Sequence, residues 1–187
     1  TDGGSAVDSQ TVNYNSTART PTAPTKEGYT FAGWYTDTDC TVEYNFSGVV
    51  TKNITLYAKW TVNTYTVTFN TDGGSAVDSQ TVNYNSTATT PTEPTKEGYT
   101  FAGWYTDADC STEYNFTASV TGNITLYAKW TVEVITDWDT LSVKLNSGTD
   151  VGNIYVSGDF EIASTISFSG KANIISTGTR VTFRRKK

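Results

Sequence analysis

Two acidic loops carry the side chains whose types come closest to a site for chemistry. Asp37-Thr38-Asp39 is followed by Glu43, and Asp107-Ala108-Asp109 is followed by Glu113. Carboxylate oxygens suit calcium, but a calcium loop needs further ligands at regular spacing. Paired carboxylates can also hydrolyse glycosides, yet active sites are seldom duplicated along an array. We therefore predict solvated acidic loops, with no metal site and no catalytic site.

The possible nucleophiles lack an activating base. The chain contains no histidine, which is the commonest general base and metal ligand. Cys40 and Cys110 occupy equivalent positions in two similar segments, so neither has a disulfide partner within its own segment. A cysteine nucleophile needs a base or a lowered pKa. We expect no enzymatic activity and no cofactor.

Aromatic residues offer a binding chemistry instead. Residues 28–35 and 98–105 share the sequence Gly-Tyr-Thr-Phe-Ala-Gly-Trp-Tyr. Exposed Trp and Tyr rings can stack on sugars, which gives four candidate ligand-stacking residues: Trp34, Tyr35, Trp104 and Tyr105. The alternative is that the rings form the core, because a small domain needs its few large side chains to bury enough area. We favour the core.

An internal repeat organises most of the chain. Residues 1–62 align without a gap with residues 71–132, and fifty-three of these sixty-two positions are identical. Such similarity indicates tandem duplication. The chain contains no methionine and opens in mid-motif, so we expect it to be a segment of a longer protein. We predict three parts: repeat one at 1–61, a complete repeat two at 62–131, and a third part at 132–187.

Repeat two has the pattern of a small β domain. Residues 64–69 alternate strictly, with Tyr65, Val67 and Phe69 inward. Asp72-Gly73-Gly74 supplies a hairpin turn, after which we predict that residues 76–84 return as a strand. Two further strands follow at residues 99–105 and 123–130. Strict alternation in the first of these predicts Phe101 and Trp104 on opposite faces.

Repeat one lacks the counterpart of the first strand of repeat two, because Thr1 aligns with Thr71. A missing strand leaves an unpaired sheet edge and an uncovered apolar groove. We therefore expect a strand from another chain to fill that groove by strand exchange.

Residues 132–187 depart from the repeat. Residues 137–145 predict a short helix that Thr136 or Asp137 can cap, with Trp138, Leu141 and Leu145 on one face. Short strands separated by Gly and Ser follow at 153–156, 160–162, 165–168, 173–175 and 180–183. This spacing suits a β-solenoid or a sandwich. The helix resembles the amphipathic cap of right-handed parallel β-helix surface domains, which predicts a truncated β-solenoid segment.

The charge distribution excludes some partners. The formal net charge is −6, and residues 1–130 hold thirteen acidic and six basic residues. An acidic surface argues against binding to nucleic acid or to anionic membranes. No run approaches the roughly 18 apolar residues of a membrane helix, so we expect no membrane insertion.

Three spaced motifs resemble a known family. They are TVTFNTDGG, PTxPTKEGYTFAGWYTD and NITLYAKW, and they resemble the Listeria–Bacteroides repeat, which is the B-repeat of internalin B. The resemblance covers residues 1–131. It implies small β-grasp-like domains strung in tandem on large bacterial surface proteins, where they serve as stalk or adhesion modules without catalytic residues. The cysteine in each repeat departs from the family pattern.

Together these observations predict a mainly β chain: tandem β-grasp-like repeats followed by a β-solenoid segment with a capping helix. The leading functional hypothesis is a segment of a bacterial cell-surface adhesin, located extracellularly at the cell surface or wall. Its repeats would act as a stalk and make weak multivalent contacts with a surface protein or glycan of a host or neighbouring cell. The alternatives are a carbohydrate-binding module and a non-catalytic part of a polysaccharide-active β-helix enzyme.

Overall fold

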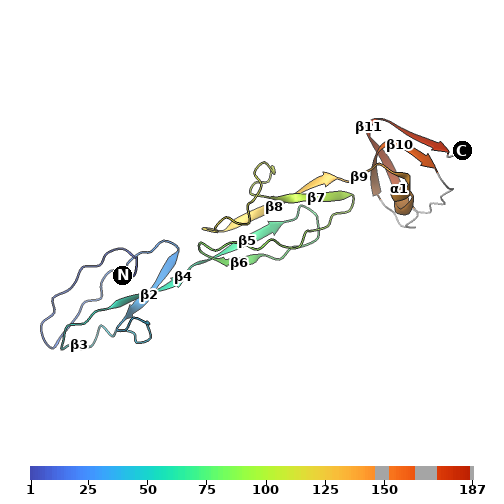
Figure 1. Ribbon diagram of the computed structural model, residues 1–187. Coiled ribbons are helices and arrows are strands. Elements are labelled where there is room, and N and C mark those ends of the chain that lie inside the picture. Colours follow the sequence, from blue (N-terminus) through green and yellow to red (C-terminus); the bar gives the residue numbers. More distant parts are fainter. Residues whose placement is uncertain (146–151, 163–171, 186–187) are drawn as a thin grey trace. The chain divides into compact units, whose positions relative to one another are not determined.

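The computed structural model describes residues 1–145, 152–162 and 172–185. Within these ranges it contains strands β1 to β11 and one short helix, α1 (Figure 1). The prediction of a mainly β fold is confirmed. The chain forms two compact units, and repeat two contributes residues to both, so the three predicted domain bounds stay a prediction. Unit 1 comprises Thr1–Thr68, Ser79–Thr90 and Asn115–Ile124, and unit 2 comprises Phe69–Asp78, Pro91–Tyr114 and Thr125–Lys187.

Unit 1 contains repeat one, which is built on two short antiparallel pairs. β2 (Tyr29–Tyr35) pairs with β4 (Tyr57–Val62), and β1 (Ser16–Thr17) pairs with β3 (Val49–Val50). Residues 10–13 and 54–56 lie beside these pairs but form no strand.

Unit 1 also contains the start of repeat two, where β5 (Thr64–Asn70) pairs antiparallel with β6 (Gln80–Asn83). The predicted alternation in β5 is confirmed, because Val67 and Phe69 are buried and Tyr65 is half-buried while the threonines at positions 64, 66 and 68 are exposed. The returning strand was predicted to start at residue 76 but begins at Gln80. Residues 76–79 form no strand. Just before them, the Ser75 amide donates a hydrogen bond to the Thr95 carbonyl at 2.8 Å.

In unit 2, β7 (Tyr99–Tyr105) pairs antiparallel with β8 (Ile124–Val132). The sheet that contains them has the strand order β6-β5-β8-β7. The pairing shifts register between Phe101 and Trp104, where Gly103 has a φ of 120°. The prediction that these rings lie on opposite faces is therefore wrong. The bulge brings them into edge-to-face contact, with centroids 5.3 Å apart.

The last part of unit 2 holds helix α1 (Trp138–Leu145) and a parallel three-stranded sheet. Asp137 caps the helix as predicted: its carboxylate accepts a hydrogen bond from the Thr140 amide at 2.7 Å, which lowers the pKa of that carboxyl. Leu141 is fully buried. This capping and burial explain why so short a helix forms.

The strand order of the parallel sheet is β11-β10-β9, with bounds Ala172–Arg185, Gly152–Ile162 and Val134–Ile135. β10 and β11 each span two of the shorter strands predicted from the sequence. In β10 the irregularity at Gly158 is a register shift within the strand and does not end it. The strand predicted at 165–168 lies outside the described residues. Parallel stacking is the pairing that a solenoid uses, while the β-solenoid itself stays a prediction.

A close junction within unit 1 joins repeat one to the start of repeat two. The Asn63 amide donates to the Gly28 carbonyl at 2.9 Å, and the Tyr84 amide donates to the Asn63 carbonyl at 2.8 Å. The Tyr84 ring lies directly over Gly28, whose φ is 74°, so that an added Cβ would overlap the ring. Partial desolvation and a hydrogen bond to Glu27 raise the pKa of the Tyr84 hydroxyl. The sequence analysis missed this junction.

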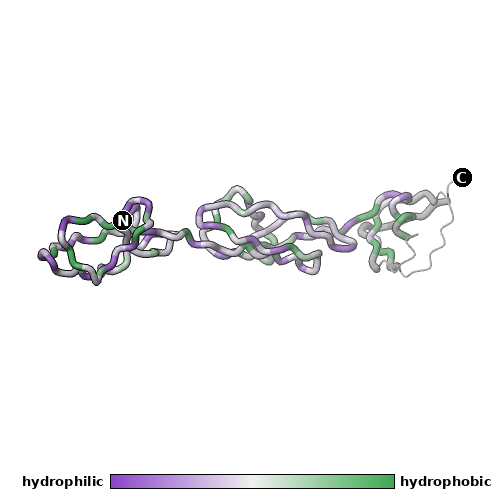
Figure 2. Tube along the Cα trace, turned by 90° about the horizontal axis from the view of Figure 1, so that it is seen from below, coloured by the Kyte–Doolittle hydropathy of each residue, from purple (hydrophilic) through white to green (hydrophobic). Residues whose placement is uncertain are grey.

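Hydrophobic and hydrophilic residues are interspersed along the coloured part of the trace, as expected for strands with one covered face (Figure 2). Among the described residues, no helix has the length and apolar character needed to cross a membrane.

Candidate functional site

The aromatic residues of β2 and β7 were the first candidates for a binding site. The structure buries the two tryptophans, with 7% of Trp34 and 4% of Trp104 exposed. In repeat two the Trp104 ring packs against Phe69 and Phe101, with centroids 4.8 and 5.3 Å away. A stacking platform needs an exposed ring face, so these tryptophans serve as core residues in this structure.

Tyr35 and Tyr105, which follow the tryptophans, are half-buried at the strand ends. A lysine ammonium lies over each ring: Lys59 Nζ is 4.8 Å from the Tyr35 centroid and Lys129 Nζ is 4.6 Å from that of Tyr105. Such cation–π contacts at partly exposed sites contribute about 0.5–1 kcal/mol each. Of the four candidate residues, the tyrosines are the ones with an accessible ring, and a stacking role for them stays a prediction.

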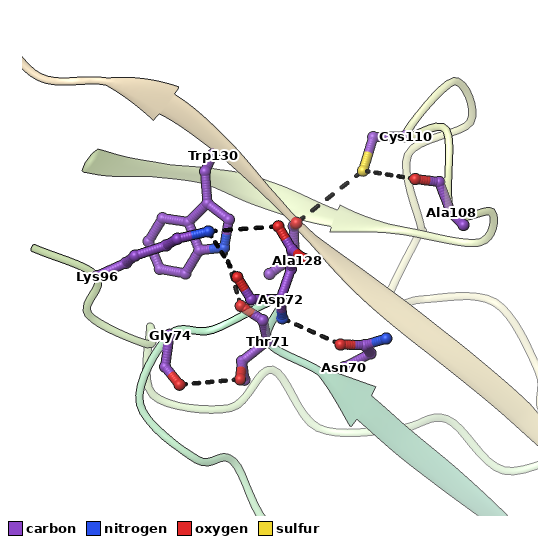
Figure 3. A network of polar contacts seen from close by, with 9 residues as sticks. All are labelled: Asn70, Thr71, Asp72, Gly74, Lys96, Ala108, Cys110, Ala128 and Trp130. Atoms are coloured by element: carbon purple, nitrogen blue, oxygen red, sulfur yellow. Dashed lines mark hydrogen bonds and ion pairs between the residues drawn. The ribbon is translucent and has the colours of Figure 1, made fainter. Parts of the chain in front are cut away.

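A lysine clasp holds the turn after β5 (Figure 3). Lys96 Nζ donates to the Asp72 carbonyl at 2.6 Å and lies 3.3 Å from the Asp72 carboxylate. The Trp130 indole donates to the Thr71 carbonyl at 2.9 Å, and Lys96 Nζ lies 5.6 Å from the centroid of the Trp130 ring. A Cβ at Gly74 would come within 2.5 Å of that ring. These motif residues are therefore explained by the architecture of the turn.

The first aspartate of each acidic loop accepts hydrogen bonds from backbone amides of the same loop. Asp37 accepts hydrogen bonds from the amides of Thr41 and Val42 at 2.8–3.2 Å, and these bonds lower its pKa. Asp107 has the same arrangement with Ser111 and Thr112. In the residues that the structure describes, no three acidic, cysteine or histidine side chains gather as metal ligands would.

The cysteines sit at the end of each acidic loop and are free thiols. Both have a positive φ, of 51° at Cys40 and 50° at Cys110, a conformation usually taken by Gly or Asn. The Cys110 sulfur lies 3.9 Å from the Ala108 carbonyl oxygen and 4.0 Å from that of Ala128 (Figure 3). Nothing in the sequence signalled this backbone conformation.

An open groove lies in repeat one. Its volume is about 590 Å³. Its lining includes segments 7–12 and 52–56 and Trp34. Other residues that line it are Ala18, Pro21, Phe46 and Val50. Polar side chains such as Gln10 and Asn53 line it together with apolar ones such as Trp34 and Leu56.

These features define the class: tandem β-sheet repeats in which a lysine and a tryptophan hold a Gly-containing turn. The pair is Lys26 and Trp60 in repeat one and Lys96 and Trp130 in repeat two. The model of the Listeria-Bacteroides repeat domain matches residues 1–59 and 65–129, and the chain belongs to that family. The resemblance predicted from the motifs is thereby confirmed for the repeats. The β-helix resemblance of the third part stays a prediction.

Relatives of this chain include three larger proteins. Internalin H of Listeria monocytogenes is 45% identical over 127 residues, which cover 66% of this chain and 23% of that protein. Two Evansella cellulosilytica proteins, named as candidate membrane proteins and one of them as Gly-rich, are each 40% identical. They match 89% and 88% of this chain, and 24% and 18% of their own lengths. The chain thus spans about a quarter or less of these relatives.

Proposed function

We propose that this chain is a segment of a bacterial cell-surface protein, in which tandem repeats act as a stalk and as weak, repeated contact modules. The observation that carries the proposal is the duplication itself. Two nearly identical repeats follow one another, and each buries the tryptophan of its aromatic motif, Trp34 or Trp104, in its own core. A relative named internalin H and two relatives named as candidate membrane proteins support placement at the cell surface.

The contacts of such a stalk are individually weak and add through multivalency. A single weak site gains apparent affinity by orders of magnitude when copies are held together on one surface. Among the duplicated residues that are at least partly accessible are Tyr35 and Tyr105 with their lysines, Lys59 and Lys129. Surface proteins and glycans of a host or neighbouring cell are the proposed partners.

Binding of the whole chain tests this proposal. Beads densely coated with the chain and the soluble chain are compared on intact cells and on a glycan panel. We expect retention of the coated beads and little binding of the soluble chain. A double variant, Tyr35→Ala with Tyr105→Ala, is expected to reduce retention. The variant Tyr14→Ala, which changes another exposed tyrosine, is the control.

The opposite outcome is equally informative. If coated beads and uncoated beads are retained equally on every surface, the contact role is wrong and a pure spacer remains. Labelling of intact cells that carry a protein with this segment, using an antibody against the repeats, tests the location. Labelling only after cell lysis would contradict the surface assignment.

A further inference from the structure

The link between repeat one and repeat two is a single residue. β4 ends at Val62 and β5 begins at Thr64, so Asn63 alone stands between them. The Asn63 amide donates to the Gly28 carbonyl at 2.9 Å, and the Asn63 side-chain oxygen accepts a hydrogen bond from the Thr30 hydroxyl at 2.7 Å. Both bonds hold the link against the aromatic strand of repeat one.

The same residue is also tied to repeat two. The Tyr84 amide donates to the Asn63 carbonyl at 2.8 Å. Tyr84 directly follows β6, and the pairing of β6 with β5 begins with Thr64 opposite Asn83. Hydrogen bonds therefore fix the link on both sides, which leaves its backbone little freedom to act as a hinge.

The Tyr84 side chain of repeat two packs onto repeat one. Its ring lies over Gly28, where any side chain would collide with it. The Tyr29 ring of repeat one meets the Tyr84 ring edge-on, with centroids 6.3 Å apart, and the Tyr65 ring of repeat two lies 6.4 Å away. Aromatic pairs of this kind stabilise a structure beyond the apolar area that they bury. The three tyrosines thus bridge the two repeats.

The contacts of the junction continue into the interior of repeat one. The Lys26 ammonium lies 4.6 Å from the centroid of the Tyr29 ring and 5.7 Å from that of Trp60. The Trp60 ring meets Phe31 edge-to-face, and the Phe31 ring also contacts Trp34. An unbroken series of contacts therefore runs from the junction to the buried tryptophan of repeat one.

The boundary between repeat two and the third part keeps only part of this arrangement. The Glu133 amide donates to the Gly98 carbonyl at 2.9 Å, so the backbone bond of the junction is present. In the described part of the chain, however, no aromatic ring packs on Tyr99, and 37% of this side chain is exposed. Its counterpart Tyr29 is half-buried. The two boundaries share a backbone bond and differ in aromatic cover.

We infer that the junction at Asn63 couples the folding of the two repeats, so that repeat one depends on repeat two for part of its stability. When neighbouring repeats share an interface, opening one of them also loses the contacts of that interface. The Tyr84 ring covers Gly28 only while β6 holds it in place. This boundary therefore resists local opening and bending more than the boundary at Glu133 does.

Hydrogen exchange of the full chain measures the coupling. The reporters are the amides of residues 33–35 and 57–59, which lie at the end of the β2–β4 pair that is far from the junction. Tyr84→Ala is expected to speed their exchange about tenfold, because opening repeat one then no longer costs the ring contacts. Tyr14→Ala, at the equivalent exposed position in repeat one, is the control and is expected to change the rates by less than about twofold.

An insertion tests the junction without removing any side chain. Gly-Ser-Gly-Ser placed between Asn63 and Thr64 makes the link flexible. It is expected to speed exchange at residues 33–35 and 57–59 at least as much as Tyr84→Ala does. The same insertion after Glu133 is the matched control. It is expected to change exchange at residues 103–105 and 127–129, the equivalent amides of repeat two, by less than about threefold.

Two results would overturn the inference. One is unchanged exchange at residues 33–35 and 57–59 in both the Tyr84→Ala variant and the chain with the insertion after Asn63. The other is an equal effect of the two insertions, each on the repeat that precedes it, which would show that the two boundaries do not differ. Should Tyr84→Ala fail to fold, the two insertions still decide the question, because they keep every side chain.

Discussion

Repeat one and repeat two have nearly the same sequence but differ in local structure. The two tryptophans, the clasp lysines and the acidic loops behave alike in both. The segments next to the position of β5 differ. Residues 80–83 are a strand and 10–13 are not, and β8 starts at Ile124 whereas β4 starts only at Tyr57. The difference teaches that a strand here is specified by its neighbour as much as by its own residues.

The largest expected effect comes from making repeat two resemble repeat one. Val67 has no exposed area, so Val67→Asp buries an unpaired carboxylate and is expected to destabilise the chain by about 4 kcal/mol or more. Urea unfolding followed by tryptophan fluorescence measures this loss. Hydrogen exchange should show that residues 80–83 lose protection. Thr68→Asp, on the exposed face, is the control, and full protection of β6 in the Val67 variant would break the comparison.

Two matched leucine-to-alanine substitutions, one in each repeat, test the difference between the repeats more closely. Leu126→Ala removes a fully buried side chain and is expected to cost about 2–5 kcal/mol. Leu56→Ala removes the same atoms from the half-buried groove and is expected to cost less than half as much, since part of the side chain already contacts water. Chemical unfolding of both variants checks this, and equal costs would show that the groove is closed in solution.

The junction gives a smaller contrast. Tyr84 packs against Gly28 and lies 6.3 Å from the Tyr29 ring, whereas its counterpart Tyr14 is 74% exposed. Tyr84→Ala is expected to cost about 1–2 kcal/mol through lost ring contacts. Tyr14→Ala is expected to change stability by less than about 0.5 kcal/mol. Thermal unfolding measures both, and a larger effect at Tyr14 would contradict the assignment of the junction.

The smallest effect should be shared by the two repeats. Backbone hydrogen bonds lower the pKa of Asp37 and Asp107 in the folded chain. Their contribution to stability is therefore present above the ordinary carboxyl pKa and is lost as the pH falls through the lowered value. Urea midpoints measured from neutral to strongly acidic pH should show a weaker acid dependence in Asp37→Ala and Asp107→Ala. An unchanged acid dependence in both variants would exclude this source.

Local patterns predicted much of this structure. The alternation in residues 64–69, the turn at Asp72-Gly73 and the cap at Asp137 are all confirmed, because each depends on neighbouring residues. The prediction that Phe101 and Trp104 lie on opposite faces of β7 was wrong. A bulge at Gly103 changes which side chains share a face, and the alternation of residues does not reveal a bulge. The register of Ile154 opposite Ile174 was also beyond reach, as it depends on long-range pairing.

The candidate site was predicted in outline only. The residues of repeat one in this chain start at the counterpart of Thr71 and so include no counterpart of β5, and the groove is lined by segments 7–12 and 52–56. The structure of segment 7–12 could not be predicted, because residues 10–13 have the same sequence as β6 and still form no strand. Likewise, a lysine that clasps a turn and a tyrosine that covers a glycine depend on packing between distant segments.

The junction at Gly28 and Tyr84 has a consequence for how such chains evolve. Both repeats carry the two halves of the joint: a glycine just before the aromatic strand, and a tyrosine just after residues 10–13 or 80–83. The amide-to-carbonyl bond from Asn63 to Gly28 recurs from Glu133 to Gly98, at 2.9 Å in both places. Unequal recombination can therefore add or delete whole units without inventing an interface. Copy number becomes a heritable quantity that selection can adjust one repeat at a time.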